Sequence, residues 1–129
     1  MSVSMRIKVA VIDDEESVRK SLARLMKSAG IEALTFASAP EFLADPIRGS
    51  MDCIVTDMRM PDLDGPALFR WIEVERPQLA SRVVFLTGDT LGPAAVRFLA
   101  ESGRPVLEKP FGPEAVRRVI ATVVSQQNG

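Results

Sequence analysis

The chain has 129 residues, 47% of them hydrophobic and 26% charged, which is typical of one folded globular domain and not of a disordered or fibrous protein. Sixteen basic and seventeen acidic residues leave a net charge of -1, so we expect no direct binding of nucleic acid. Histidine is absent, which excludes a Ser/His/Asp triad and a zinc site built on imidazole. No apolar stretch reaches the ~18 residues of a membrane span, and residues 1–5 lack the apolar core of a signal peptide. We therefore expect a cytoplasmic protein without a membrane segment.

Short apolar runs alternate with helix-patterned segments along the chain, which predicts consecutive βαβ units and a parallel sheet. The predicted strands are 9–12, 31–36, 52–56, 83–87 and 106–107. The first is apolar throughout, as expected for a strand covered on both faces, whereas Glu32 and Thr35 interrupt the second, as expected at a sheet edge. Cys53 lies within the third run, where we expect a buried, unreactive thiol.

Five helices are predicted between and after these strands. The first carries apolar residues at Val18, Leu22 and Leu25 and ends at Gly30, a C-terminal cap. The others are expected at 38–44, at 66–76, from Pro93, and from Pro113 with a stripe that begins at Val116. Residues 125–129 are expected to fray.

Polar residues stand where the predicted strands end: Asp13, Asp14, Asp57, Thr87 and Lys109. Each has an ordinary explanation when taken alone, such as acidic residues that complement a helix N-terminus or a lysine that is merely solvated. Strand ends of a parallel sheet share one edge, however, and ligands bind outside that edge where the strand order reverses. We therefore expect these side chains to line one pocket.

Three clustered carboxylates raise one another's pKa values unless a cation compensates their charge. Hard oxygen ligands select magnesium or calcium, and magnesium also takes a phosphate oxygen as a ligand. An aspartate at the head of a loop, such as Asp57, can act as a nucleophile and form an acyl phosphate. The Lys109 ammonium and the Thr87 hydroxyl suit the phosphoryl oxygens, so the set predicts phosphoryl chemistry.

Four sequence blocks resemble the receiver (response-regulator) family in order and spacing. They are 11–15 (VIDDE), 57–65 (DMRMPDLDG), 86–88 (LTG) and 108–111 (EKPF). The resemblance extends over about residues 6–124 and implies an α/β, flavodoxin-like doubly wound sheet of five parallel strands in the order 2-1-3-4-5, with five helices. It also implies that residues 1–129 form a single receiver domain, with no output domain in this chain.

Carried over by position, the resemblance implies Asp57 as the phosphoacceptor, with Thr87 and Lys109 holding the phosphoryl group. The implied ligands of Mg²⁺ or Mn²⁺ are three carboxylates and one backbone carbonyl: Asp13, Asp14, Asp57 and Arg59. The Lys109–Pro110 bond is expected to be cis. The donor would be a phosphohistidine on a histidine kinase or a histidine phosphotransfer protein, and the chain would catalyse only its own phosphorylation and dephosphorylation.

The resemblance further implies that the signal is a shift of the face formed by the helix from Pro93, the strand at 106–107 and the helix from Pro113. The resemblance also implies that a homodimer of this chain is possible through the same face. Many members carry Tyr or Phe where this chain has Val106, so the aromatic part of the switch is missing. We expect Val106 to be an ordinary core valine.

Arg59 and Asp89 lie two residues beyond Asp57 and Thr87. Our hypothesis is that they pair across the pocket mouth and slow loss of the phosphoryl group. Exposed ion pairs are worth only ~0–1 kcal/mol, so a structural effect alone is the competing explanation.

Three other functions fit less well. A magnesium-dependent phosphatase with an aspartyl nucleophile is the main alternative, but it commonly has a second Asp at the position of Arg59. A calcium-binding EF-hand fails on register, because Gly65 at loop position six places Met60 and Trp71 at ligand positions. A flavodoxin would need a phosphate-cradling loop where residues 13–16 are all acidic.

Overall fold

The structure is a computed structural model, and it describes residues 6–45, 49–88 and 91–128. Its centre is a five-stranded sheet in the order β2-β1-β3-β4-β5, with every neighbouring pair parallel. The strands are β1 (Lys8–Ile12), β2 (Glu32–Phe36), β3 (Cys53–Asp57), β4 (Val83–Thr87) and β5 (Val106–Glu108). The strand order and the parallel pairing confirm the prediction, and β3 lies one residue later than expected.

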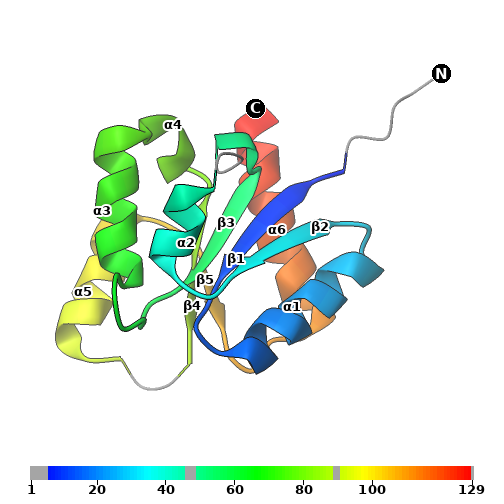
Figure 1. Ribbon diagram of the computed structural model, residues 1–129, viewed down its shortest axis with the longest axis horizontal. Coiled ribbons are helices and arrows are strands. Elements are labelled where there is room, and N and C mark those ends of the chain that lie inside the picture. Colours follow the sequence, from blue (N-terminus) through cyan, green and yellow to red (C-terminus); the bar gives the residue numbers. More distant parts are fainter. Residues whose placement is uncertain (1–5, 46–48, 89–90, 129) are drawn as a thin grey trace.

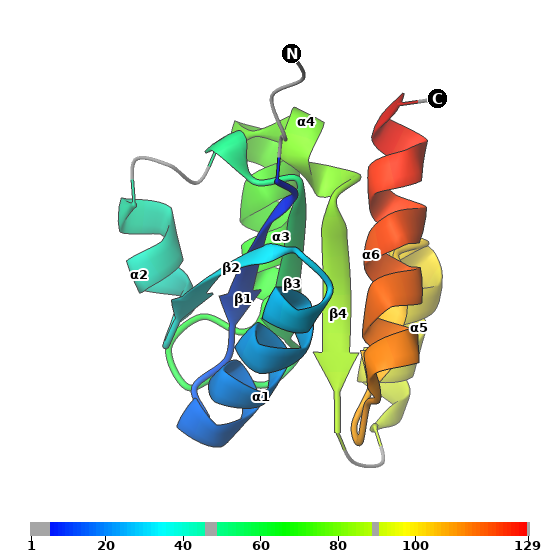
Figure 2. The same cartoon turned by 90° about the vertical axis from the view of Figure 1, so that its right-hand side faces the viewer.

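Helices cover both faces of the sheet (Figures 1 and 2). One face carries α1 (Glu16–Ser28) and α6 (Pro113–Asn128), and the other carries α2 (Ala39–Ala44), α3 (Gly65–Glu75), α4 (Pro77–Ala80) and α5 (Pro93–Ser102). The described part of the chain thus has six helices where five were predicted. The extra one, α4, has four residues and starts at Pro77, with one residue between it and the end of α3. The fourth and fifth predicted helices are α5 and α6.

The interior strand β1 shows why the sheet needs cover on both sides. Val9 and Val11 pack into the cluster under α1 and α6, whereas Ala10 and Ile12 pack into the cluster under α2 and α3. All four side chains are fully buried. Side chains alternate between the faces of a strand, so an uninterrupted apolar run is what two covered faces require.

Helix α5 is attached to the sheet mainly through aromatic packing. None of its residues is fully buried, but Ala95 and Phe98 pack against the core. The ring of Phe98 meets Phe85 of β4 and Phe69 of α3 edge to face, at centroid distances of 5.3 and 6.0 Å. Pairs of this geometry contribute about 0.5–1.5 kcal/mol beyond area burial. The helix next to the strand ends is therefore held by few side chains.

Local signals set the helix ends. Asp64 caps α3 by accepting a hydrogen bond from the Ala67 N–H at 2.9 Å, and Ser38 caps α2 in the same way. Gly30 follows α1 with φ of 77°, a left-handed conformation that glycine adopts without a Cβ penalty. The predicted end of the first helix is thus confirmed.

One expectation is wrong. Val106 is not a core residue: it is 38% exposed, and only Leu107 of β5 is buried. The strand is three residues long and lies at the sheet edge. Residues 125–128 belong to α6, which extends to Asn128, and their fraying stays a prediction.

Cys53 is buried as predicted, and desolvation raises the pKa of its thiol to about 12.

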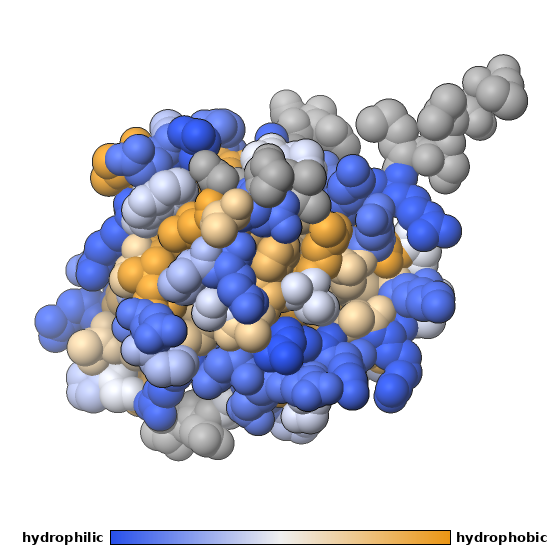
Figure 3. Space-filling view, in the orientation of Figure 1, coloured by the Kyte–Doolittle hydropathy of each residue, from blue (hydrophilic) through white to orange (hydrophobic). Residues whose placement is uncertain are grey.

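None of the helices in the described part of the chain combines the length and the apolar content that a membrane span requires. Figure 3 shows one face of the molecule, where hydrophilic side chains surround apolar ones near the middle.

Candidate functional site

The carboxyl ends of β1, β3, β4 and β5 lie at one edge of the parallel sheet. Figure 2 shows β1 and β4 pointing away from the C-terminal end of α6. A pocket of about 230 Å³ opens at this edge of the sheet. It is lined by polar residues from these strand ends and by loop residues: Asp14, Glu15, Asp57, Met58, Arg59, Thr87, Gly88, Leu91 and Lys109. The structure thus brings four of the five polar strand-end residues into one pocket, and the fifth, Asp13, lies beside it.

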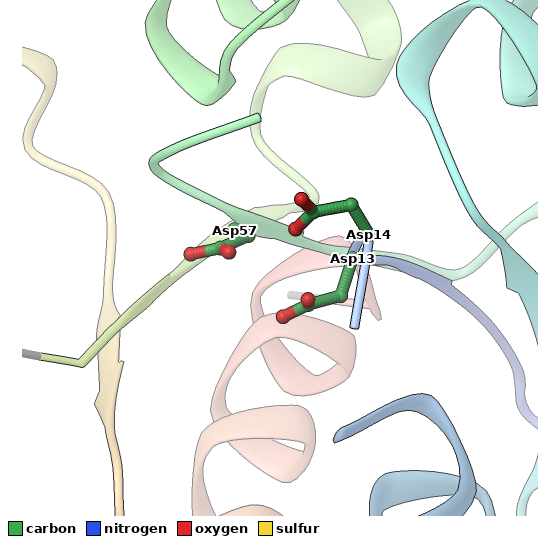
Figure 4. A group of neighbouring side chains, drawn as sticks. All are labelled: Asp13, Asp14 and Asp57. Carbon is green, nitrogen blue, oxygen red and sulfur yellow. The ribbon is translucent and has the colours of Figure 1, made fainter. Parts of the chain in front are cut away.

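Three carboxylates form the acidic part of the site. Asp13 and Asp14 follow β1 and Asp57 ends β3, and one oxygen of each lies within 4.8 Å of the others. Figure 4 shows the carboxyl groups of Asp13 and Asp14, which follow β1, near that of Asp57 at the end of β3. Asp13 and Asp57 are buried, whereas Asp14 is exposed. The group is thus anchored in the protein on one side and open to solvent on the other.

The backbone and side chain of Asp13 are held by three hydrogen bonds. Its Oδ1 accepts from the Glu15 N–H at 2.8 Å, its N–H donates to the Phe36 carbonyl at 3.1 Å, and its carbonyl accepts from Arg19 Nη1 at 2.7 Å. Its buried Oδ2 has no hydrogen-bond partner. Lys109 Nζ lies 3.5 Å from this oxygen, at the limit of hydrogen-bond distance.

A buried carboxylate oxygen without a hydrogen-bond partner is costly, so it requires an explanation. A cation between Asp13, Asp14 and Asp57 would give Asp13 Oδ2 the partner that it lacks. Because all the donor atoms are oxygens, the site suits a hard divalent metal. The residues at the site therefore fit a metal ion.

Burial and the nearby charges shift the pKa values of Asp13 and Asp57. Burial raises the pKa of Asp57 to about 6, and the charge of Asp13 acts in the same direction against the opposing effect of Lys109. Burial also raises the pKa of Asp13, although the Glu15 N–H and Lys109 oppose it. A bound cation favours the charged form of both carboxyl groups.

Lys109 supplies the positive charge that lies nearest the buried carboxylates, and the exposed Arg59 also lines the pocket. Its Nζ lies 3.5 Å from Asp13 Oδ2, 3.8 Å from Asp57 Oδ2 and 3.9 Å from Glu15 Oε1. Its backbone N–H donates to the Thr87 carbonyl at 2.8 Å, which ties the end of β5 to the end of β4. The Lys109–Pro110 bond is cis, as expected. One ammonium group is therefore shared by three carboxylates.

Two glycines, Gly65 and Gly88, lie so close to site residues that a side chain at either position would contact them. A Cβ on Gly65 would lie 2.6 Å from the Asp57 carbonyl oxygen and 3.1 Å from Met58 Cα. The first turn of α3 therefore packs directly onto the backbone of the candidate phosphoacceptor. A Cβ on Gly88 would lie 3.4 Å from Lys109 Cδ, which is a milder restriction.

Arg59 is exposed at the pocket, and Thr87 is buried in its wall. The predicted pairing of Arg59 with Asp89 concerns a residue outside the described ones.

Comparisons with known proteins identify the family of the chain. The family model described as "Response regulator receiver domain" matches residues 9–121. The chain is 32% identical over 125 residues to the C4-dicarboxylate transport transcriptional regulatory protein DctR of Rhodobacter capsulatus, covering 97% of this chain and 64% of DctR. It is 37% identical over 108 residues to the transcriptional regulatory protein FixJ of Azorhizobium caulinodans, covering 84% of this chain and 50% of FixJ. The chain therefore spans one half to two thirds of the length of these relatives.

Solved structures give the same result. The chemotaxis protein CheY4 of Vibrio cholerae superposes with a TM-score of 0.80 at 25% identity, covering 92% of this chain and 99% of CheY4. A response regulator receiver domain protein from Clostridium thermocellum gives a TM-score of 0.77 at 28% identity, covering 94% and 96%.

Proposed function

Because the chain belongs to the response regulator receiver domain family, we propose that it accepts a phosphoryl group on Asp57 from a phosphohistidine. The donor would be a histidine kinase or a histidine phosphotransfer protein. The observation that carries this proposal is that residues from four separate strand ends surround one pocket, with the Asp57 carboxylate at its acidic end and the Lys109 ammonium 3.8 Å away.

The transfer needs a nucleophile and a leaving group. An oxygen of the Asp57 carboxylate forms a bond to phosphorus while the bond from phosphorus to the donor's imidazole nitrogen breaks, and that nitrogen keeps the electron pair. Asp57 must be ionised to attack, and its pKa of about 6 leaves it mostly ionised at neutral pH. No general base is required, so the residues around it act by positioning and charge.

The ligands proposed for Mg²⁺ or Mn²⁺ are three carboxylates and a backbone carbonyl: Asp13, Asp14, Asp57 and Arg59. The cluster of three carboxylate oxygens within 4.8 Å and the orphaned Oδ2 of Asp13 support this assignment. A cation bound there would neutralise charge on the phosphoryl oxygens. Asp13 is buried and the Glu15 N–H holds its Oδ1, so its carboxylate would help to fix the position of the ion.

Thr87 and Lys109 would hold the phosphoryl group after transfer. The Thr87 residue is 6% exposed and lines the pocket, where its hydroxyl can donate to one phosphoryl oxygen. Lys109 can pair with another oxygen because its ammonium already faces Asp57. With these groups the chain would catalyse only its own phosphorylation and dephosphorylation.

The proposed output is a shift of the face formed by α5, β5 and α6. Val106 is 38% exposed on β5, and a groove of about 470 Å³ runs between β5 and α6 past Val106, Arg118 and Val119. A largely apolar groove suits a protein partner, either a downstream target or a second copy of this chain. The net charge of -1 gives no support for direct nucleic-acid binding.

The test is intact-mass analysis after incubation with acetyl phosphate and magnesium. We expect wild type to gain one phosphoryl group, and Asp57→Asn and metal-free wild type to gain none. Asp62→Asn is the matched control, because Asp62 is an exposed carboxylate in the same loop that does not line the pocket. Wild type that stays unmodified with both acetyl phosphate and phosphoramidate contradicts the proposal.

A further inference from the structure

Glu15 places a fourth carboxylate at the pocket, outside the metal cluster. Its side chain is 62% exposed, lines the pocket mouth, and lies with Oε1 3.9 Å from Lys109 Nζ. Lys109 is the cation that the phosphoryl group needs, and it is itself only 21% exposed. The Glu15 carboxylate thus lies beside one of the groups that are proposed to contact the phosphoryl oxygens.

The local structure does not depend on this carboxylate. Glu15 is the N-cap residue of α1, but its side chain makes no capping hydrogen bond. Its structural contacts come from the backbone: its N–H donates to Asp13 Oδ1, and its carbonyl accepts from the Arg19 N–H. Substitution of the side chain leaves both bonds in place, so the carboxylate can be changed without disturbing Asp13.

The charges around Lys109 define a competition. In the unphosphorylated site, the ammonium is shared among Asp13, Asp57 and Glu15 at 3.5 to 3.9 Å. A phosphoryl group on Asp57 brings two negative charges that require the same ammonium. Asp13 and Asp57 are committed to the metal and the phosphoryl group. Glu15 has neither role, so its attraction for Lys109 persists as a cost to the phosphorylated state.

We propose that Glu15 lowers the affinity of the pocket for a phosphoryl group by competing for the Lys109 ammonium. The inference rests on the proposed function and adds a residue that sets the strength of phosphoryl binding at that site. Because the Glu15 carboxylate is mostly exposed and its pair with Lys109 is long, solvent screens the competition. Its removal is expected to tighten binding by about two- to fivefold.

The experiment measures binding of beryllofluoride, a mimic of the phosphoryl group, by isothermal titration calorimetry with saturating magnesium. Glu15→Gln removes the charge and keeps the size of the side chain. Glu15→Asp keeps the charge but withdraws the carboxylate by about 1.5 Å, the length of one C–C bond. The matched control is Glu16→Gln, because Glu16 stands in the same first turn of α1 but pairs with Lys20 at 2.8 Å.

Glu15→Gln should bind beryllofluoride about two- to fivefold more tightly than wild type, Glu15→Asp should also gain affinity, and Glu16→Gln should match wild type. A gain cannot arise from structural damage, which would weaken binding. Equal affinities of Glu15→Gln and Glu16→Gln, or a wild-type affinity in Glu15→Asp, overturn the inference alone. Absence of beryllofluoride binding by wild type overturns the proposed function and the inference with it.

Discussion

The approach of Gly65 to Asp57 leads to a sharp prediction for Gly65→Ala. The new Cβ would lie 2.6 Å from the Asp57 carbonyl oxygen and 3.1 Å from Met58 Cα, whereas ordinary contacts of a Cβ begin near 3.4 Å. Both neighbours are backbone atoms and cannot rotate away. The first turn of α3 must therefore move off the end of β3 by roughly 0.5–1 Å, and overpacking of this kind costs about 1–3 kcal/mol.

The assay combines urea denaturation with the initial rate of phosphorylation by acetyl phosphate. Gly65→Ala should lose about 1–3 kcal/mol of unfolding free energy and phosphorylate more slowly, because the backbone that carries Asp57 is displaced. Gly49→Ala is the control, since nothing lies within 4 Å of its Cβ position and its φ is not positive. A Gly65→Ala protein with the stability and rate of wild type would refute the reasoning.

Three further predictions follow from the site and its supports. In the absence of metal, Asp57→Asn should be more stable than wild type at pH 7 by up to about 3 kcal/mol. The reason is that the pKa of Asp57 is raised from 3.8 to about 6 in the folded state, so wild type loses stability as the pH rises through that window. The gain should vanish near pH 4, and urea titrations that show the same difference at every pH would exclude this origin. Phe98→Ala should cost about 2–4 kcal/mol through lost ring packing, whereas Val96→Ala, at an exposed position of the same helix, should change stability by less than about 0.5 kcal/mol; equal effects in thermal melts would show that α5 is not held by the Phe98 ring. Arg59→Ala should shorten the lifetime of the phosphoryl group if Arg59 shields the pocket mouth, and an unchanged decay of the phosphorylated mass would count against that role.

The sequence predicted those parts of the fold that depend on repeated patterns. The uninterrupted apolar run of β1 indicated an interior strand, because a strand that is buried on both faces has apolar residues at successive positions. Polar residues in β2 indicated an edge strand, because part of such a strand faces solvent. The grouping of Asp57, Thr87 and Lys109 was predictable for a geometric reason, since the carboxyl ends of parallel strands share one edge.

Other features depend on contacts that no local pattern encodes. Helix α4 is too short to establish a helical period, and the three residues of β5 could not reveal that Val106 is exposed. The close approach of Gly65 to Asp57 and the pairing of Glu15 with Lys109 arise only when distant segments meet. The orphaned oxygen of Asp13 is likewise visible only when all its neighbours are placed.

The most direct test of phosphoryl capture by Asp57 is chemical mapping of the modified residue. After phosphorylation with acetyl phosphate and magnesium, borohydride reduces an acyl phosphate to an alcohol, which marks the acceptor permanently for peptide mass analysis. We expect the mark on residue 57 of wild type, and no mark in Asp57→Asn. A mark on Asp13, Asp14 or any other carboxylate of wild type would contradict the assignment of Asp57 as the phosphoacceptor.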